Sequence, residues 1–126
     1  MIQGDMMELS PLNVVVAFIQ PFQLESVVDA LRQVAGCPGM SVSDVQGVGC
    51  TGAHPPLRGE RTEVEPLDRK VRIEIFCAAP AVADIVETVR VAAHTGNPGD
   101  GKIFVMPVAN DERIRTGVAG EAAVRL

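Results

Sequence analysis

Apolar positions along the chain change their period from one segment to the next. Residues 13–19 form a short, β-branched apolar run that ends before Pro21, which is typical of a buried strand. The following segment carries apolar residues at helical spacing and is closed by Gly36. Residues 40–48 alternate imperfectly and indicate a second strand. The buried side of the predicted helix consists of Leu24, Val27, Val28, Leu31 and Val34.

The second half of the chain repeats this order. Residues 71–77 alternate between apolar and polar or aromatic side chains and predict a third strand. A second helix ends near Thr95, and residues 102–108 indicate a fourth strand. The sequence therefore predicts an α+β fold of the ferredoxin-like, split β-α-β type, βαββαβ, with an antiparallel sheet and two helices on one face. The apolar stripe of the second helix is Val82, Ile85, Val86, Val89 and Ala93.

The two halves are separated by a segment without sustained periodicity. Residues 49–69 are rich in glycine, proline and charge, and a loop of this length inside a compact domain usually has a function. We expect a single domain over residues 13–117, preceded by a flexible leader (1–12) and followed by a short tail (118–126). Because both helices cover one face of the sheet, apolar residues on the other face predict an oligomer.

Composition and charge narrow the range of functions. The net charge is −5 and lysine and arginine do not cluster, which argues against a nucleic-acid partner. The longest apolar run, residues 14–19, is too short to cross a membrane, and residues 1–10 do not resemble a signal peptide. The three cysteines, Cys37, Cys50 and Cys77, lack the spacing of a disulfide framework and suit a reducing compartment. We therefore expect a cytoplasmic protein.

Two short segments carry groups suited to a polyanion. In Gly99-Asp100-Gly101-Lys102, glycines would let backbone N–H groups approach a phosphate, and the lysine would neutralise its charge. The same residues could instead form a tight turn with a solvated lysine. Arg113 and Arg115 would project to one side of an extended segment and could grip one polyanion, or could form an ordinary solvated edge.

Signals for metal binding and catalysis are weaker. Cys50 and His54 are two soft ligands, too few for a structural zinc site. His94 lies at the expected end of a helix, where capping accounts for it. No spacing of nucleophile and base supports covalent catalysis, so we predict no catalytic and no metal-binding residues.

Taken in order, these segments resemble the PII family of signal-transduction proteins over residues 13–117. The most specific match is residues 95–108, Thr-Gly-Asn-Pro-Gly-Asp-Gly-Lys-Ile-Phe-Val-Met-Pro-Val, followed by Arg-Ile-Arg-Thr-Gly at 113–117. Supporting matches are Pro21-Phe22, Gly39-Met-Ser41, Gly47-Val-Gly49 and the segment 70–75.

The resemblance implies a non-catalytic homotrimer without a cofactor, with nucleotide sites in the clefts between subunits. It implies that Gly99, Asp100, Gly101 and Lys102 hold phosphates, and that Arg113 and Arg115 reach them from the neighbouring subunit. Adenine would contact Gly39, Ser41 and the backbone near Glu74 and Ile75, above a base formed by Gly47 and Gly49. The long loop, 49–69, would dock on a transporter or metabolic enzyme.

Departures from the family pattern change the expected ligand. Where the family often has Arg-Gln after its Gly-x-Gly, this chain has Cys50 and Thr51, which shifts the expectation from ATP with 2-oxoglutarate towards ADP or AMP. Lys70 remains at the position of the lysine that assists 2-oxoglutarate binding. The chain has no tyrosine, so the loop uridylylation of nitrogen-regulatory members is impossible here. These losses favour a member linked to inorganic carbon, with bicarbonate as an effector.

Three other functions stay open at this point. The first is a nitrogen-regulatory PII protein that senses ATP and 2-oxoglutarate. The second is a trimer that binds divalent metals through Cys50 and His54, which would leave Lys102 and the two arginines unexplained. The third is a hydrolase of phosphates or acyl phosphates, which would need a general base that no residue supplies plainly.

Overall fold

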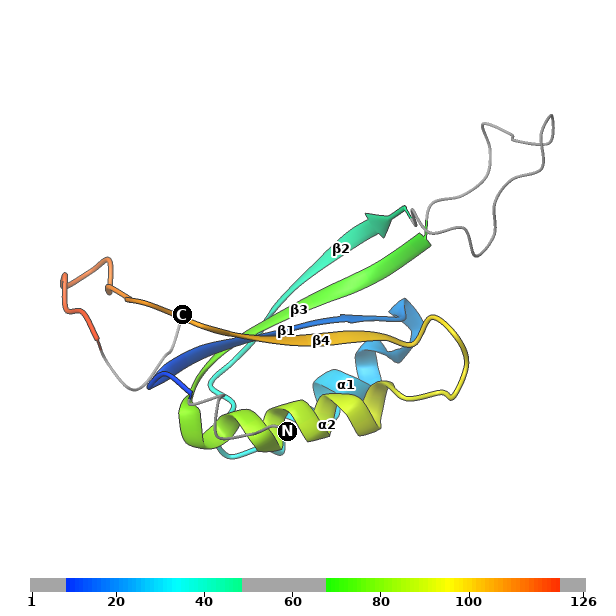
Figure 1. Ribbon diagram of the computed structural model, residues 1–126, viewed down its shortest axis with the longest axis horizontal. Helices are drawn as coiled ribbons and strands as arrows, with labels where there is room; N and C mark the ends of the chain where they lie inside the picture. Colours follow the sequence, from blue (N-terminus) through cyan, green and yellow to red (C-terminus); the bar gives the residue numbers. More distant parts are fainter. Residues whose placement is uncertain (1–8, 49–67, 121–126) are drawn as a thin grey trace.

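The computed structural model describes residues 9–48 and 68–120 as one four-stranded antiparallel sheet backed by two helices (Figure 1). The sheet order is β2-β3-β1-β4. This arrangement confirms the predicted α+β fold with both helices on one face. In chain order the elements are β1 (Leu12–Ile19), η2 (Pro21–Gln23), α1 (Leu24–Leu31), β2 (Ser41–Gly47), β3 (Asp68–Ala78), η3 (Ala79–Ala81), α2 (Val82–Ala93) and β4 (Gly101–Pro107).

The central strand β1 organises the sheet. It pairs with β3 on one side and β4 on the other, so that Val15 lies opposite both Ile75 and Val105. Alternate β1 side chains face the helices, and Val15 and Ala17 are fully buried there. Its remaining side chains lie on the opposite face of the sheet, as the period of a strand requires. β1 thus contributes to both faces.

The helices follow the predicted pattern, with one difference in length. α2 buries Val82, Ile85, Val89 and Ala93, as expected. α1 ends at Leu31, five residues before the predicted stop at Gly36. The reason is that its last bonds tighten to a three-residue spacing, as in the bond from the Val34 N–H to the Leu31 carbonyl (3.0 Å). No helix in the described ranges is long and apolar enough to cross a membrane.

Strand β3 begins earlier than the sequence indicated. Asp68 and Arg69, which we predicted to lie in the long loop, are its first residues and pair with the end of β2, where Gly47 lies opposite Asp68. Because both residues are polar, the alternation of apolar and polar positions does not include them. The sequence pattern therefore could not show that the strand extends this far. The rest of the predicted loop, residues 49–67, lies outside the described residues.

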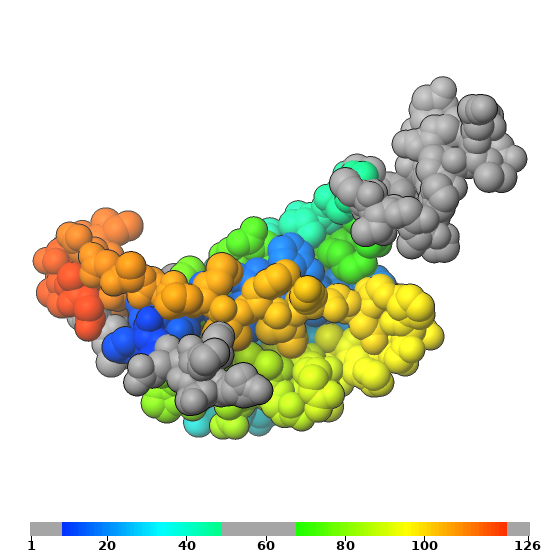
Figure 2. Space-filling model, in the orientation of Figure 1, coloured from blue at the N-terminus to red at the C-terminus, as the bar shows by residue number. Residues whose placement is uncertain are grey.

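The face of the sheet that the helices leave open is apolar along β1 and β4. Phe104 and Met106 remain 42% and 43% exposed there, and Figure 2 shows β4 as a continuous strip at the surface. The Phe18 and Phe104 rings meet edge to face with their centroids 6.2 Å apart. Arg72 lies over the Phe18 ring and forms an ion pair with Glu74. This exposed apolar strip is the kind of surface that the prediction of an oligomer requires.

We predict that Ile85→Ala lowers the free energy of unfolding by about 2–5 kcal/mol, because it leaves a cavity beneath α2 where the side chain is fully buried. Urea denaturation would measure the change. Val91→Ala on the same helix is the control, since Val91 is 59% exposed and its truncation should change the free energy by less than about 1 kcal/mol. Equal losses in the two variants would contradict the assignment of the core.

Candidate functional site

The loop between α2 and β4 is held together by one carboxylate. Asp100 Oδ2 accepts hydrogen bonds from the backbone N–H groups of Thr95 (2.8 Å) and Gly96 (2.9 Å), and Oδ1 accepts one from the Thr95 hydroxyl. The Thr95 hydroxyl oxygen in turn accepts a bond from the Asn97 N–H at 3.1 Å. These bonds give the loop a defined shape. We call residues 95–102 the phosphate loop, after the role that the sequence predicts for it.

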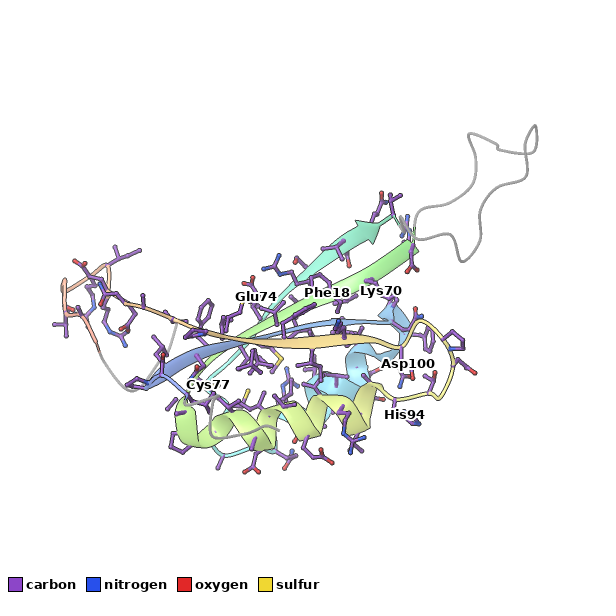
Figure 3. All side chains as sticks on the ribbon, viewed as in Figure 1. Phe18, Lys70, Glu74, Cys77, His94 and Asp100 are labelled. Carbon is purple, nitrogen blue, oxygen red and sulfur yellow. The ribbon has the colours of Figure 1, made fainter. Side chains whose placement is uncertain are left out.

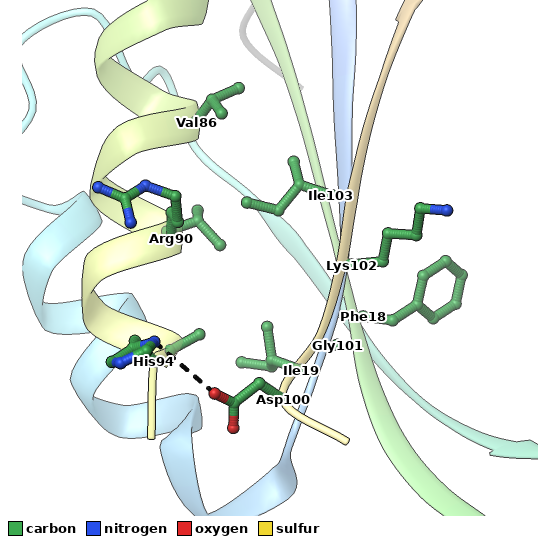
Figure 4. Close-up of a pocket in the computed structure, with 11 residues that line it drawn as sticks. Phe18, Ile19, Val86, Arg90, His94, Asp100, Gly101, Lys102 and Ile103 are labelled. Carbon is green, nitrogen blue, oxygen red and sulfur yellow. Dashed lines mark ion pairs between the residues drawn. The ribbon is translucent and has the colours of Figure 1, made fainter. Parts of the chain in front are cut away.

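The bonds that close the phosphate loop also keep Asp100 ionised. The hydroxyl and N–H donors of Thr95 and the N–H of Gly96 lower the pKa of the Asp100 carboxyl below its ordinary 3.8. At the C-terminal end of α2, His94 Nδ1 lies 3.8 Å from Asp100 Oδ2 (Figures 3 and 4). Because the pKa is lowered, the anchor is fully present above pH 3.8 and is lost only as the pH falls through the lowered value.

Gly101 is the residue where the phosphate loop joins the sheet. Its φ is +114°, and a Cβ added there would lie 1.8 Å from the Phe18 carbonyl oxygen. No other residue fits this close approach of two backbones. Gly99 also has a positive φ, +94°, so the loop uses glycine on both sides of Asp100.

Lys102 projects to the open face of the sheet. It pairs with Phe18 across the strands, and its ammonium lies 5.3 Å from the centre of the Phe104 ring. Figure 4 shows Lys102 and Phe18 on one side of β4, whereas Ile103 points to α2 on the other. A cavity of about 420 Å³ lies between α2 and the start of β4, and Lys102 is among the residues that line it. Within the described ranges, no carboxylate forms an ion pair with Lys102, so its charge is available to an anion.

Arg113 and Arg115 lie in a turn, and not in an extended segment that would project both side chains to one side. The Gly117 N–H donates to the Arg113 carbonyl (2.7 Å), and the Arg113 N–H donates to Val118 (2.8 Å). A bridge between Glu112 and Ala119 closes this small hairpin. Glycine at 117, with φ +74°, permits the reversal that strand alternation cannot foresee. The two side chains therefore need not project to one side.

The phosphate loop and the arginine hairpin lie at opposite ends of the molecule (Figure 1). β4 separates them, and a strand of seven residues is about 20 Å long. One copy of the chain therefore does not bring Lys102 and Arg115 to the same ligand.

The other predicted site residues fall into a third group. Ser41 begins β2 and lies directly opposite Glu74 on β3, so the fold brings these two together. The Ile75 side chain is fully buried towards the helices, so the predicted contact of adenine with this residue could involve only its backbone. Gly39 precedes β2 in an exposed position, and Gly47 ends that strand on the edge opposite to β4. Gly49, like Cys50, Thr51 and His54, lies outside the described residues.

Two further predictions concern Lys70 and metal binding. Lys70 on β3 forms an ion pair with Asp68 at 2.6 Å, and its side chain is 12% exposed. In the part of the chain that the structure describes, no three histidine, cysteine or acidic side chains cluster as a metal site would require.

Sequence reasoning missed the residues that hold the phosphate loop in place. Gln20, directly after β1, donates from Nε2 to the Gly99 carbonyl at 2.7 Å. Thr95 supplies two of the donors to Asp100. The Thr95–Asp100 pair could have been suspected from its short spacing, but Gln20 is 79 residues away and only strand pairing brings it near.

Comparisons with known proteins agree on one family. The family model described as nitrogen regulatory protein P-II matches residues 12–118. The chain is 46% identical over 109 residues to nitrogen regulatory protein P-II of Cereibacter sphaeroides, covering 86% of this chain and 96% of that protein. It is 40% identical over 114 residues to nitrogen regulatory protein GlnK of Escherichia coli, covering 90% of this chain and all of that protein (100%). The crystal structure of Arabidopsis thaliana PII bound to citrate is similar with a TM-score of 0.72 and 34% identity, covering 91% of this chain and 94% of that one.

We predict that Gly101→Ala destabilises the protein by about 2 kcal/mol or more, because the new Cβ overlaps the Phe18 backbone in a strained conformation. Gly96→Ala is a matched control in the same loop. It also has a positive φ, +91°, but its nearest neighbour, His94 Nε2, would be 3.7 Å from the Cβ. Urea denaturation should show the larger loss for Gly101→Ala, and equal losses would contradict the close approach.

Proposed function

The chain belongs to the P-II family of nitrogen regulatory proteins, and from this premise we propose that it is a non-catalytic regulator that binds an adenine nucleotide through its phosphates. The observation that carries the proposal is the phosphate loop, which is held by the bonds of Asp100 and ends in a lysine without an acidic partner in the described chain. Such a loop offers backbone N–H groups and one cation to a polyanion with little reorganisation.

Asp100 has a structural part in this proposal. Its carboxylate accepts bonds from Thr95 and Gly96 at the beginning of the loop, so its charge is already met by protein donors. A phosphate would meet Lys102 and those N–H groups of the loop that Asp100 and Thr95 do not already bind.

The second part of the proposal is that the site lies between copies of the chain. Arg113 and Arg115 lie about one strand length, about 20 Å, from the phosphate loop, so they would reach a nucleotide held by a neighbour. The exposed Phe104 and Met106 support an assembly on the open face of the sheet. A closed ring of three copies would repeat the same site three times and bury these faces.

The choice of nucleotide and effector follows from the sequence departures. Cys50 and Thr51 lack the guanidinium and amide that would serve the far phosphate and a bound magnesium, so we propose that ADP or AMP binds better than ATP. The nitrogen-regulatory names of the relatives favour control of nitrogen metabolism through residues 49–69. The missing tyrosine and the same two departures favour a second candidate, control of inorganic-carbon uptake with bicarbonate as effector.

Calorimetric titration tests the proposed function. The panel consists of ATP, ADP and AMP, each with and without magnesium, 2-oxoglutarate or bicarbonate. We expect ADP or AMP to bind more tightly than ATP, with Kd values below about 1 mM. If no adenine nucleotide binds in this range, the proposed function is wrong. If 2-oxoglutarate with magnesium strengthens ATP binding, the nitrogen-sensing alternative replaces the ADP/AMP preference, whereas a bicarbonate effect supports the second candidate.

A complementation experiment tests whether the site is shared. Lys102→Met and Arg115→Ala should each weaken ADP binding by about 10- to 100-fold, since each removes a charged hydrogen bond to phosphate. In a co-refolded 1:1 mixture of the two variants, about one site in four combines an intact lysine with an intact arginine from its neighbour.

That quarter of the sites should bind with wild-type affinity. Arg32→Ala, which removes an exposed arginine on the helical side of the molecule, is the control and should leave binding unchanged. If the mixture forms mixed oligomers and no fraction of the sites recovers wild-type affinity for ADP, the proposal of a shared site is wrong.

A further inference from the structure

Gln20 is a polar residue of the described chain that neither the sequence motifs nor the proposed site includes. It follows the last residue of β1, and its Nε2 donates to the Gly99 carbonyl at 2.7 Å. Resting on the proposed function, we propose that Gln20 is a positioning residue that sets the direction of the Gly99–Asp100 peptide, and with it the direction in which the phosphate loop presents an N–H group to phosphate.

The geometry of a peptide links the directions of its carbonyl and its N–H group. In a trans peptide the carbonyl and the following N–H point in opposite directions, and the described chain contains no cis bond. Directing the Gly99 carbonyl to Gln20 therefore turns the Asp100 N–H away from Gln20. The opposite orientation would present a carbonyl oxygen to the ligand, and its partial negative charge would repel a phosphate.

Gly99 does not fix this orientation by itself. With φ at +94° and no side chain, its backbone has more freedom than any other residue would have. The Gly99 carbonyl accepts its hydrogen bond from Gln20 in the described structure. The direction of this carbonyl therefore depends on the Gln20 side chain.

The other anchors of the loop lie on either side of this peptide. Asp100 ties its carboxylate back to Thr95 and Gly96, and Gly101 is held against the Phe18 carbonyl. Neither contact determines where the Gly99 carbonyl points. Gln20 supplies the missing constraint from the sheet, because Ile19 next to it pairs with Gly101.

β1 makes a firm base for this contact. It is paired along its length on both sides and is almost entirely buried. A side chain at the end of β1 can therefore hold the glycine-rich loop in a fixed position relative to the sheet. We expect that loss of the Gln20 donor leaves the fold intact. The loop would then lose conformational entropy when phosphate binds, and this loss would weaken binding.

The test uses Gln20→Met, which keeps the length of the side chain and removes its donor. We expect the affinity for ADP, AMP and pyrophosphate to fall by about three- to tenfold, as for loss of one modest hydrogen bond. Affinity for adenosine, which carries no phosphate, should stay within about twofold of the wild type. The thermal unfolding midpoint should change little, because the bond lies at the surface.

Gln23→Met is the matched control. Gln23 makes the same kind of bond, from Nε2 to the Ala92 carbonyl at 3.0 Å, but it reaches the end of α2 and not the phosphate loop. Its loss should leave the affinities for ADP and pyrophosphate unchanged.

The outcomes separate this inference from the function on which it rests. If the wild type binds no adenine nucleotide, both fail. If the wild type binds ADP and Gln20→Met binds it equally well, only the role of Gln20 fails. A loss of adenosine affinity equal to the loss of ADP affinity, or an equal loss in Gln23→Met, would also overturn it, since either result indicates a general structural effect.

Discussion

The pairing of β1 with two antiparallel neighbours is the constraint on which the rest of the structure depends. This strand places Ile19 opposite Gly101 and Phe18 opposite Lys102, so the strand register fixes where the phosphate loop begins. The same strand carries Val15 and Ala17 into the core beneath the helices and Val16 to the open face. A shift by one residue would exchange these faces and would move Gly101 off the Phe18 carbonyl.

The phosphate loop illustrates how flexible residues can build a rigid element. Glycines at 99 and 101 allow backbone conformations that other residues avoid, but they also increase the freedom lost on ordering. The carboxylate of Asp100 and the amide of Gln20 offset this by binding backbone groups within the loop. The carboxylate of Asp100 turns into the loop, so the net charge of −5 does not by itself argue against the proposed binding of an anion there.

The length of β4 determines how the proposed ligand would be held. It places Lys102 and the two arginines at opposite ends of one chain, and no rearrangement within the sheet would bring them together. The same strand exposes Phe104 and Met106 on the face that the helices leave open. Association and ligand binding are therefore expected to depend on each other, since the contact that covers the apolar face would also complete the site.

The sequence by itself determined the order of the elements, because apolar periods of two and of about 3.6 residues specify which segments must bury one face. It also identified the family to which the chain belongs, and it predicted Gly99–Lys102 as phosphate-binding residues. It could not place the end of α1, the start of β3 or the turn at Arg113, since these depend on individual hydrogen bonds and on pairing partners. Only the tertiary structure brought Gln20 to Gly99 and separated Lys102 from Arg115, because strand register sets distances between residues that are far apart in the chain.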